Sequence, residues 1–403
     1  MKEVYDLITI GAGASGIIAS IRAAERGKHV LLLEKYDHPG KKILASGNGR
    51  CNLMNRGIPR YYGDQNFAGD VLNYCSKDKI DSYFKHLGLI TYEEAEGRIY
   101  PYSNQSATVM NVLKTAMELF GVQIKLNAHV DSVSYDGIRF SVKTETGEEY
   151  HSDNLLVACG GEAQPKLGGT RDGYKILQSM GHSVIPTFPA LVPLETDRKS
   201  ISGLSGIRVK CEVTLYCNNR MIHREEGEVL FTEYGISGIC IMQCARFVHD
   251  KVSRIELDLL KRYTSDIDGI YKELLRRKVL FRNLSPTLML DGILGSKLSY
   301  AVMKQAGIPL KGEKISDLSD DDLRHIIYAA THYRIEITGT RGFDYAQVTA
   351  GGAECSEFDP KTMESRIIPG LYATGEVLNV DGDCGGFNLM FAFASGLTAG
   401  EQI

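Results

Sequence analysis

Apolar runs separated by glycine turns mark the start of the chain. Tyr5–Ile10 is an apolar run that ends directly in the glycine-rich turn Gly11–Gly16. A helical spacing of apolar residues follows and stops at Gly27. A second apolar run, Val30–Leu33, precedes Glu34. The pattern predicts a strand, a glycine turn, a helix, a second strand and an acid.

The pattern continues with alternating helices and strands. Helical spacing predicts helices over Val71–Leu87 and Gln105–Phe120, with a strand-turn-strand element between them. A strand-rich region begins at Val122, and the apolar run Leu155–Ala158 predicts a strand that enters a second glycine turn. A short helix is expected from Asp172.

The middle of the chain changes character near residues 186–193. Apolar and polar residues alternate from Val209 to Tyr216, which predicts a strand half exposed to water, and Glu228–Thr232 predicts another. Residues 264–328 have a helical pattern, and Tyr333–Thr338 returns to a strand pattern. These observations predict a small β-domain followed by helices.

The tail holds a second informative pattern. Leu371–Ala373 predicts a strand, Gly382–Gly386 predicts a tight loop that needs small residues, and Phe387–Gly396 predicts a helix. The N-terminus of that helix would stabilise the negative charge that a reduced flavin develops.

The glycine turn predicts dinucleotide binding. Gly11 allows the tight turn, Gly13 leaves room for a pyrophosphate, and Gly16 lets the helix lie close to the strand. Glu34 is placed to accept hydrogen bonds from ribose hydroxyls, and its carboxylate disfavours NADP at this site. The turn-rich segment Lys35–Asn55 suits contact with a second face of a large dinucleotide, with Arg50 as a hydrogen-bond donor. The turn and the tail together favour FAD over NAD.

Composition narrows the class of protein. The chain has 403 residues and a formal net charge of −4, and no dense basic cluster, so nucleic acid is not expected as a partner. The first residues do not form a signal peptide, and no stretch reaches the length of a membrane span. Nine scattered cysteines without a CxxC pair indicate a reducing, cytoplasmic setting and no disulfide framework. No metal site is predicted, and the oligomeric state stays open.

Beyond these motifs, the chain resembles a family of NAD(P)/FAD-dependent flavoproteins that includes aminoacetone-oxidase-like and bile-acid-dehydrogenating or -reducing members. The resemblance covers nearly the whole length. The motifs that carry it are GAGASG at 11–16, GKKILASGNGRCN at 40–52, PKLGGTRDGY at 165–174, LFTEYGISG at 230–238, and VTAGG through GGFNL at 348–389.

The resemblance implies an α/β fold: a Rossmann-like FAD-binding domain built from both chain ends, with an inserted β-barrel-like domain and a helical insert. The implied boundaries are 1–190 and 345–403 for the FAD-binding domain, 191–255 and 331–344 for the barrel, and 256–330 for the helical insert. The residues that it implies as FAD contacts are Gly11, Gly13, Ala14, Ser15, Gly16, Glu34, Lys35, Lys42, Ser46, Gly47, Arg50, Cys51, Val130, Ala158, Gly160, Asp172, Gly375, Glu376, Asp381, Gly386, Asn388 and Leu389.

The expected activity is that of an FAD-dependent oxidoreductase that moves a hydride between flavin N5 and a small or steroid-like substrate. NAD(P)H, if it is the donor, would bind only transiently, because no second full dinucleotide motif is present. Arg50, Glu233 and Tyr234 are the candidates for substrate orientation or proton transfer. Glu233 and Ile239 depart from the histidine and proline that the family often has there, which leaves the substrate open.

Three alternatives stay open. The protein could be a flavoprotein oxidase of an amine such as aminoacetone that uses O2. It could be a binding protein in which FAD is structural, or an RNA-modifying flavoprotein. The absence of a basic stripe counts against the last of these.

Overall fold

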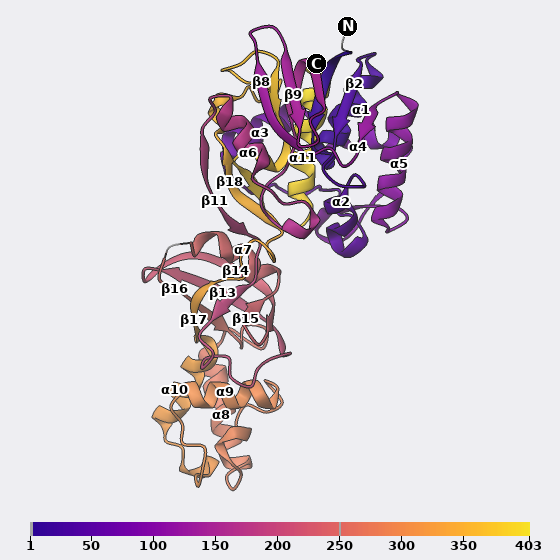
Figure 1. The fold of residues 1–403 in the computed structure, drawn as a ribbon. Coiled ribbons are helices and arrows are strands. Elements are labelled where there is room, and N and C mark those ends of the chain that lie inside the picture. Colours follow the sequence, from indigo (N-terminus) through magenta and orange to yellow (C-terminus); the bar gives the residue numbers. More distant parts are fainter. Residues whose placement is uncertain (1–2, 250) are drawn as a thin grey trace. The chain divides into compact units, whose positions relative to one another are not determined.

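The computed structural model describes residues 3–249 and 251–403 (Figure 1). The chain divides into two compact units. The first comprises the chain up to Pro189 together with Gln347–Ile403, and the second comprises Ala190–Ala346.

The first unit is built on a mainly parallel sheet. Its strands stand in the order β7–β2–β1–β10–β9–β8, and β19 also pairs with β10. Strands β7, β2, β1, β10 and β19 run parallel, whereas β8 and β9 are antiparallel additions. Their bounds are β1 Val4–Ile10, β2 Val30–Leu33, β7 Gln123–Lys125, β8 Val130–Tyr135, β9 Phe140–Thr144, β10 Glu149–Val157 and β19 Leu371–Ala373.

The register of this sheet brings three predicted site segments to one edge. Ile10 at the end of β1 lies opposite Leu33 on β2 and Val157 on β10. Gly11, Glu34 and Ala158 follow these residues directly. Because parallel strands end at the same edge, residues far apart in the sequence become neighbours there, at the carboxyl ends where open α/β sheets bind ligands.

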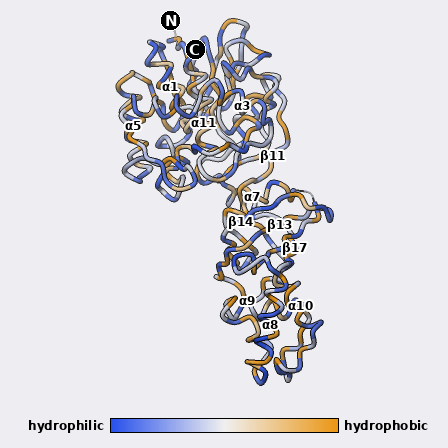
Figure 2. Tube along the Cα trace, turned by 180° about the vertical axis from the view of Figure 1, so that it is seen from behind, coloured by the Kyte–Doolittle hydropathy of each residue, from blue (hydrophilic) through white to orange (hydrophobic). Residues whose placement is uncertain are grey.

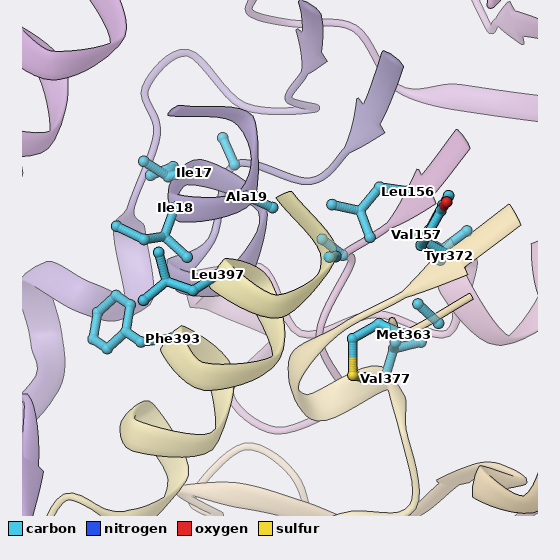
Figure 3. Packing of buried hydrophobic residues seen from close by; sticks show 14 of the residues in the cluster. Ile17, Ile18, Ala19, Leu156, Val157, Met363, Tyr372, Val377, Phe393 and Leu397 are labelled. Carbon is cyan, nitrogen blue, oxygen red and sulfur yellow. The ribbon is translucent and has the colours of Figure 1, made fainter. Parts of the chain in front are cut away.

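Helix α1 (Ala14–Glu25) packs closely on α11 (Phe387–Gln402), which joins the two chain ends. A Cβ added to Gly396 would lie 2.5 Å from the Ser15 carbonyl oxygen, so the absence of a side chain permits this approach. Figure 3 shows Leu397 of α11 beside Ile18 of α1, with Phe393 one turn away. The Phe393 ring also meets the edge of Phe84 at 4.9 Å between ring centres.

The remaining elements of the first unit surround this core. The helices are α2 Lys41–Ala45, α3 Gln65–Tyr74, α4 Lys77–His86, α5 Ser106–Leu119 and α6 Asp172–Ser179. Smaller sheets pair β6 with both β3 and β5, β20 with β4, and β11 with β18. Their bounds are β3 Met54–Asn55, β4 Tyr61–Gly63, β5 Thr91–Glu93, β6 Arg98–Pro101, β11 Val184–Ala190, β18 Val348–Ala353 and β20 Val380–Gly382.

The prediction of one helix over Val71–Leu87 is wrong. Helix α3 ends at Tyr74, and Ser76 opens α4 by accepting a hydrogen bond from the Lys79 N–H. A serine N-cap favours a new helix start over continuation, and the apolar spacing alone did not separate the two helices.

The second unit contains a closed barrel with strands in the order β12–β15–β14–β13–β16–β17. The predicted alternation holds on β13, where Cys211, Val213 and Leu215 are buried, and Asn218 and Asn219 turn the chain into β14 with positive φ angles. The strand bounds are β12 Leu194–Thr196, β13 Arg208–Cys217, β14 Arg220–Phe231, β15 Gly235–Ser237, β16 Ser253–Asp258 and β17 Tyr333–Thr340.

Helices complete the second unit: α7 Ile239–Cys244, α8 Ile267–Leu280, α9 Ser296–Gln305 and α10 Asp320–Thr331. Hydrophobic and hydrophilic residues alternate in short stretches along α8, α9 and α10 (Figure 2). Ile270 and Leu274 of α8 and Leu323 and Ile326 of α10 are buried, as amphipathic helices require.

The predicted fold class is confirmed: a Rossmann-like α/β unit with a barrel insert and helices. The three sets of domain boundaries stay a prediction. Within residues 3–249 and 251–403, no helix is both long and apolar enough to cross a membrane.

Candidate functional site

The glycine turn after β1 is crowded on one side and open on the other. A Cβ added to Gly11, where φ is 104°, would lie 2.6 Å from the Ala158 carbonyl oxygen. A Cβ on Gly16 would lie 2.0 Å from the Gly11 carbonyl oxygen. A Cβ on Gly13 would meet nothing within 4 Å. Gly13 also caps α1 without a side-chain hydrogen bond, so the open side lies at a helix N-terminus with unpaired N–H groups, a setting that favours phosphate.

Glu34 holds the glycine turn in place. Its Oε2 accepts a hydrogen bond from the Ala12 N–H at 2.9 Å, and its Oε1 accepts one from the Tyr36 N–H at 3.0 Å. The Ala128 N–H donates to the Glu34 carbonyl at 2.8 Å. A carboxylate oxygen has room for a second donor, so these contacts are compatible with the predicted ribose contact.

Lys35 and Asp172, both predicted as cofactor residues, lie together. The Asp172 Oδ2 is 3.5 Å from the Lys35 Nζ and 3.0 Å from the His129 Nε2. Burial alone would raise the pKa of Asp172, but hydrogen bonds from Thr170 and His129 and the Lys35 charge lower it. Asp172 is therefore ionised at neutral pH. Val130, the neighbour of His129, is buried at the start of β8.

The two chain ends meet beside the glycine turn. The Ser15 hydroxyl donates to the Thr374 carbonyl at 3.3 Å. A Cβ added to Gly375 would lie 2.6 Å from the Ser15 Oγ. The Gly375 N–H donates to the Ser395 hydroxyl at 3.0 Å, which fixes the turn on α11. The predicted contacts from the start and the end of the chain thus form one neighbourhood.

A half-buried ion pair links the segment after β2 to the tail. The Lys42 Nζ lies 2.8 Å from the Glu376 Oε2. The other carboxylate oxygen of Glu376 accepts the Thr349 N–H at 2.7 Å. The N–H of Gly40, two residues before Lys42, donates to the Ala12 carbonyl at 2.9 Å. Lys42 and Glu376 therefore lie within the same network as the glycine turn.

The loop from Ser46 to Cys51 has a strained backbone. Gly47, Asn48 and Cys51 have positive φ angles of 56°, 55° and 61°. The Cys51 N–H donates to the Ser46 carbonyl at 3.0 Å. Burial raises the pKa of Cys51 to about 11, against a lowering hydrogen bond from Ser46. The thiol is protonated at neutral pH, so it is a poor nucleophile.

The guanidinium of Arg50 is already engaged. Its Nη2 donates to the Tyr92 hydroxyl at 2.9 Å, the Glu94 Oε1 at 3.0 Å and the Asn104 Oδ1 at 2.7 Å. The guanidinium carbon lies 4.0 Å from the centre of the Tyr100 ring. Arg50 is thus fixed by the β5–β6 hairpin and the residues after it, a contact set that the sequence pattern did not indicate.

The tail loop lies against the segment that follows Cys51. A Cβ added to Gly386, where φ is 105°, would lie 2.7 Å from both the Asn52 Oδ1 and the Met54 carbonyl oxygen. The Asn388 amide bonds both backbone groups of Gly382 at 2.8 Å. Gly386 is the N-cap of α11, so this loop presents a second helix N-terminus. Asp381 is buried in β20, and Leu389 packs against the core.

Glu233 and Tyr234 belong to the second unit, whereas Arg50 belongs to the first. Glu233 is exposed and Tyr234 is half-buried. The Tyr234 ring lies 4.2 Å from the guanidinium carbon of Arg341. The sequence pattern missed Arg341, because nothing local connects it with Tyr234.

The first unit fits a long dinucleotide. Added Cβ atoms at Gly13 and Gly160 would meet nothing within 4 Å, so the backbone is open at both turns. The two helix N-termini, at Gly13 and Gly386, favour negative charge. Lys35 and Lys42 add cations at the same edge of the sheet.

A family profile described as HI0933-like protein Rossmann domain matches residues 5–402. The chain belongs to the HI0933-like family. The 3-dehydro-bile acid delta(4,6)-reductase of Clostridium scindens is 35% identical to it over 97% of this chain and 97% of that protein. The ribosomal RNA dihydrouridine synthase of Escherichia coli is 31% identical over 100% of this chain and 98% of that protein. The ribosomal RNA dihydrouridine synthase of Haemophilus influenzae is 32% identical over 98% of this chain and 97% of that protein.

The HI0933-like chain is an FAD-dependent oxidoreductase, and the predictions of the enzyme class and of FAD are confirmed. A small-molecule substrate fits the reductase among its relatives. The exclusion of nucleic acid and the cytoplasmic location stay predictions. Because two relatives are ribosomal RNA dihydrouridine synthases, experiment must test the exclusion of nucleic acid.

Proposed function

We propose that this protein reduces a carbon–carbon double bond conjugated to a carbonyl group in a ring of its substrate. The full-length relatives support this reaction class by their names. One is a delta(4,6)-reductase of 3-dehydro-bile acids, and two make dihydrouridine, which is uridine with its ring double bond saturated. A shared reaction on unlike substrates points to shared chemistry at the cofactor.

The residues of the first unit would hold FAD in a fixed place. Gly13 leaves the backbone bare beside the N-terminus of α1, which suits the pyrophosphate. Glu34 is positioned for a ribose hydroxyl, and the N-terminus of α11 at Gly386 suits the electron-rich edge of the flavin ring. FAD itself supplies hydride transfer, and the protein orients it and tunes its potential.

Arg50, Glu233 and Tyr234 remain the proposed residues for substrate orientation or proton transfer. Arg50 is positioned by Tyr92, Glu94 and Asn104, so it would act as a fixed positive charge. Ene reduction needs a proton as well as a hydride. A phenol such as that of Tyr234 or an acid such as Glu233 would supply it.

The test uses the holoenzyme, reduced without air and mixed with a candidate substrate. A 3-oxo-4,6-diene bile acid is expected to reoxidise the flavin and to lose a double bond, which mass spectrometry detects as a gain of two hydrogens. The matching saturated 3-oxo acid is the control and is expected to leave the flavin reduced. If the diene acid also leaves the flavin reduced, the steroid substrate is wrong.

Ribosomal RNA is the second candidate substrate. Two relatives that match this chain over nearly their full length are ribosomal RNA dihydrouridine synthases. The reduced enzyme is incubated with ribosomal RNA that lacks dihydrouridine, and the digested RNA is analysed for it. Formation of dihydrouridine would replace the steroid assignment and overturn the prediction that nucleic acid is not a partner. If neither substrate is reduced, the proposed ene reduction fails.

A further inference from the structure

Arg341 lies between two tyrosine rings beside strand β12 of the barrel. Its guanidinium carbon is 4.2 Å from the centre of the Tyr234 ring and 4.1 Å from that of the Tyr345 ring. Leu194 of β12 lies opposite both Ile236 of β15 and Thr340 of β17. The Thr196 N–H donates to the Tyr234 carbonyl at 3.3 Å, and the Arg341 N–H donates to the Pro193 carbonyl at 3.1 Å, so Tyr234 and Arg341 flank β12 from its two sides. We call Tyr234, Arg341 and Tyr345 the tyrosine clamp.

The charge of Arg341 is only loosely paired. The Glu195 Oε1 is 3.8 Å from the Arg341 Nε, which is too far for a hydrogen bond. Among residues 3–249 and 251–403, we find no side chain or carbonyl that accepts a hydrogen bond from this guanidinium. Arg50, in contrast, donates to three side chains. The clamp thus fixes a cation while leaving its N–H groups available.

The clamp is reachable from water. Tyr345 is 53% exposed, and the Arg341 side chain is 23% exposed. A guanidinium stacked between rings is oriented and weakly hydrated, and its planar N–H groups match the two oxygens of a carboxylate or phosphate. The stacking restricts the side chain before a ligand arrives, so less entropy is lost on binding.

We propose that the tyrosine clamp binds an oxyanion of the substrate, a carboxylate or a phosphate, through Arg341. That the bound ligand is the substrate of this protein rests on the proposed function. The tyrosine clamp would then select ring substrates that carry an anionic group. A purely structural clamp would hold the segment after β17 without preferring charged ligands.

The experiment measures binding to the oxidised holoenzyme, so no turnover is needed. The probes are a 3-oxo-4,6-diene bile acid, its neutral methyl ester, uridine 5′-monophosphate and uridine, each titrated by calorimetry. We expect the wild type to bind one anion at least about tenfold more tightly than its neutral partner, and Arg341→Gln to remove that preference. A preference for the acid identifies a carboxylate, and one for the nucleotide identifies a phosphate.

Two further variants make the test specific. Arg334→Gln removes another exposed arginine of the same unit, one paired with Glu336, and is expected to keep the preference. Tyr345→Leu removes one ring but keeps the charge, and is expected to reduce the preference several-fold even if Arg341→Gln fails to fold. The proposal is overturned if neither anion is preferred, or if the preference survives in both clamp variants. The ene-reduction test can fail while this binding result stands, so the two failures are distinguishable.

Discussion

Individual glycines in the first unit have separable roles. Gly16 is needed for folding, because a Cβ there would lie 2.0 Å from a backbone oxygen, whereas Gly13 has open space and an ordinary φ of −88°. We expect Gly13→Ala to keep the thermal stability of the cofactor-free protein but to weaken FAD binding by roughly ten- to a hundredfold. Gly16→Ala is expected to lose about 3 kcal/mol or more of unfolding free energy. Thermal denaturation and FAD titration check both.

Equal FAD affinity in Gly13→Ala and the wild type would contradict the placement of the pyrophosphate at this turn.

The glycine spacing predicted this turn from the sequence alone, since its residues are contiguous. The partners of Arg50 and of Tyr234 could not be predicted, because Tyr92, Asn104 and Arg341 are distant in sequence and reach them through tertiary contacts. Sequence spacing carries no signal for such pairs.

A buried histidine joins two elements of the first unit. His182, between α6 and β11, shares hydrogen bonds with the Glu357 Oε2 at 2.8 Å and the Ser365 Oγ at 2.9 Å. Burial lowers the pKa of His182 below its ordinary value of 6.5, although Glu357 opposes this. Burial alone would raise the pKa of Glu357, but hydrogen bonds from Ser183 and His182 lower it below 4.5.

The free energy of unfolding is expected to fall as the pH decreases. Below about pH 6.5 the unfolded histidine takes up a proton that the folded one resists, so the free energy of unfolding falls. Below about pH 4.5 it falls further, because the unfolded Glu357 is protonated first. His182→Gln is expected to show a shallower loss of stability between pH 7 and pH 5, measured by urea denaturation. An unchanged slope in this variant would contradict the argument.

Helix α10 of the second unit begins with a capping box. The Ser319 hydroxyl accepts the Asp322 N–H at 3.1 Å, and the Asp322 Oδ2 accepts the Ser319 N–H at 2.7 Å. Ser319→Ala is expected to cost about 1 kcal/mol of unfolding free energy. Ser265→Ala, at an exposed position before α8, is the matched control and is expected to change it by less than about 0.5 kcal/mol. If chemical denaturation shows equal losses of unfolding free energy in Ser319→Ala and Ser265→Ala, the capping box does not stabilise α10.

A serine followed by three aspartates is a local signal for a helix start, so the cap at Ser319 can be predicted from adjacent residues. The sequence predicted α5, α6, α11 and the β5–β6 hairpin, each of which has a clear period or a terminal signal. The helix boundary at Ser76 was missed because apolar spacing runs through it. Local signals thus predict elements well where caps and periods agree, and fail where they compete.

At the scale of the whole molecule, the sheet explains why both chain ends carry site residues. β19 pairs with β10, and α11 packs on α1, so the tail completes the unit that the first residues begin. The dinucleotide-binding part of the fold was predictable because each chain end carries its own glycine pattern, whereas the full division into an FAD-binding domain, a barrel and a helical insert came from the family resemblance. The substrate was not predictable, because it depends on side chains such as those of Tyr234 and Arg341, which come from distant parts of the chain.

The most direct test of the central claim is the visible absorption spectrum of the purified protein, followed without air while NADH and then NADPH are added. We expect flavin absorption bands that bleach with one of these donors. Bands that do not bleach would contradict NAD(P)H as the donor. The absence of flavin bands, even after reconstitution with FAD, would contradict both FAD binding and flavin-dependent oxidoreductase activity.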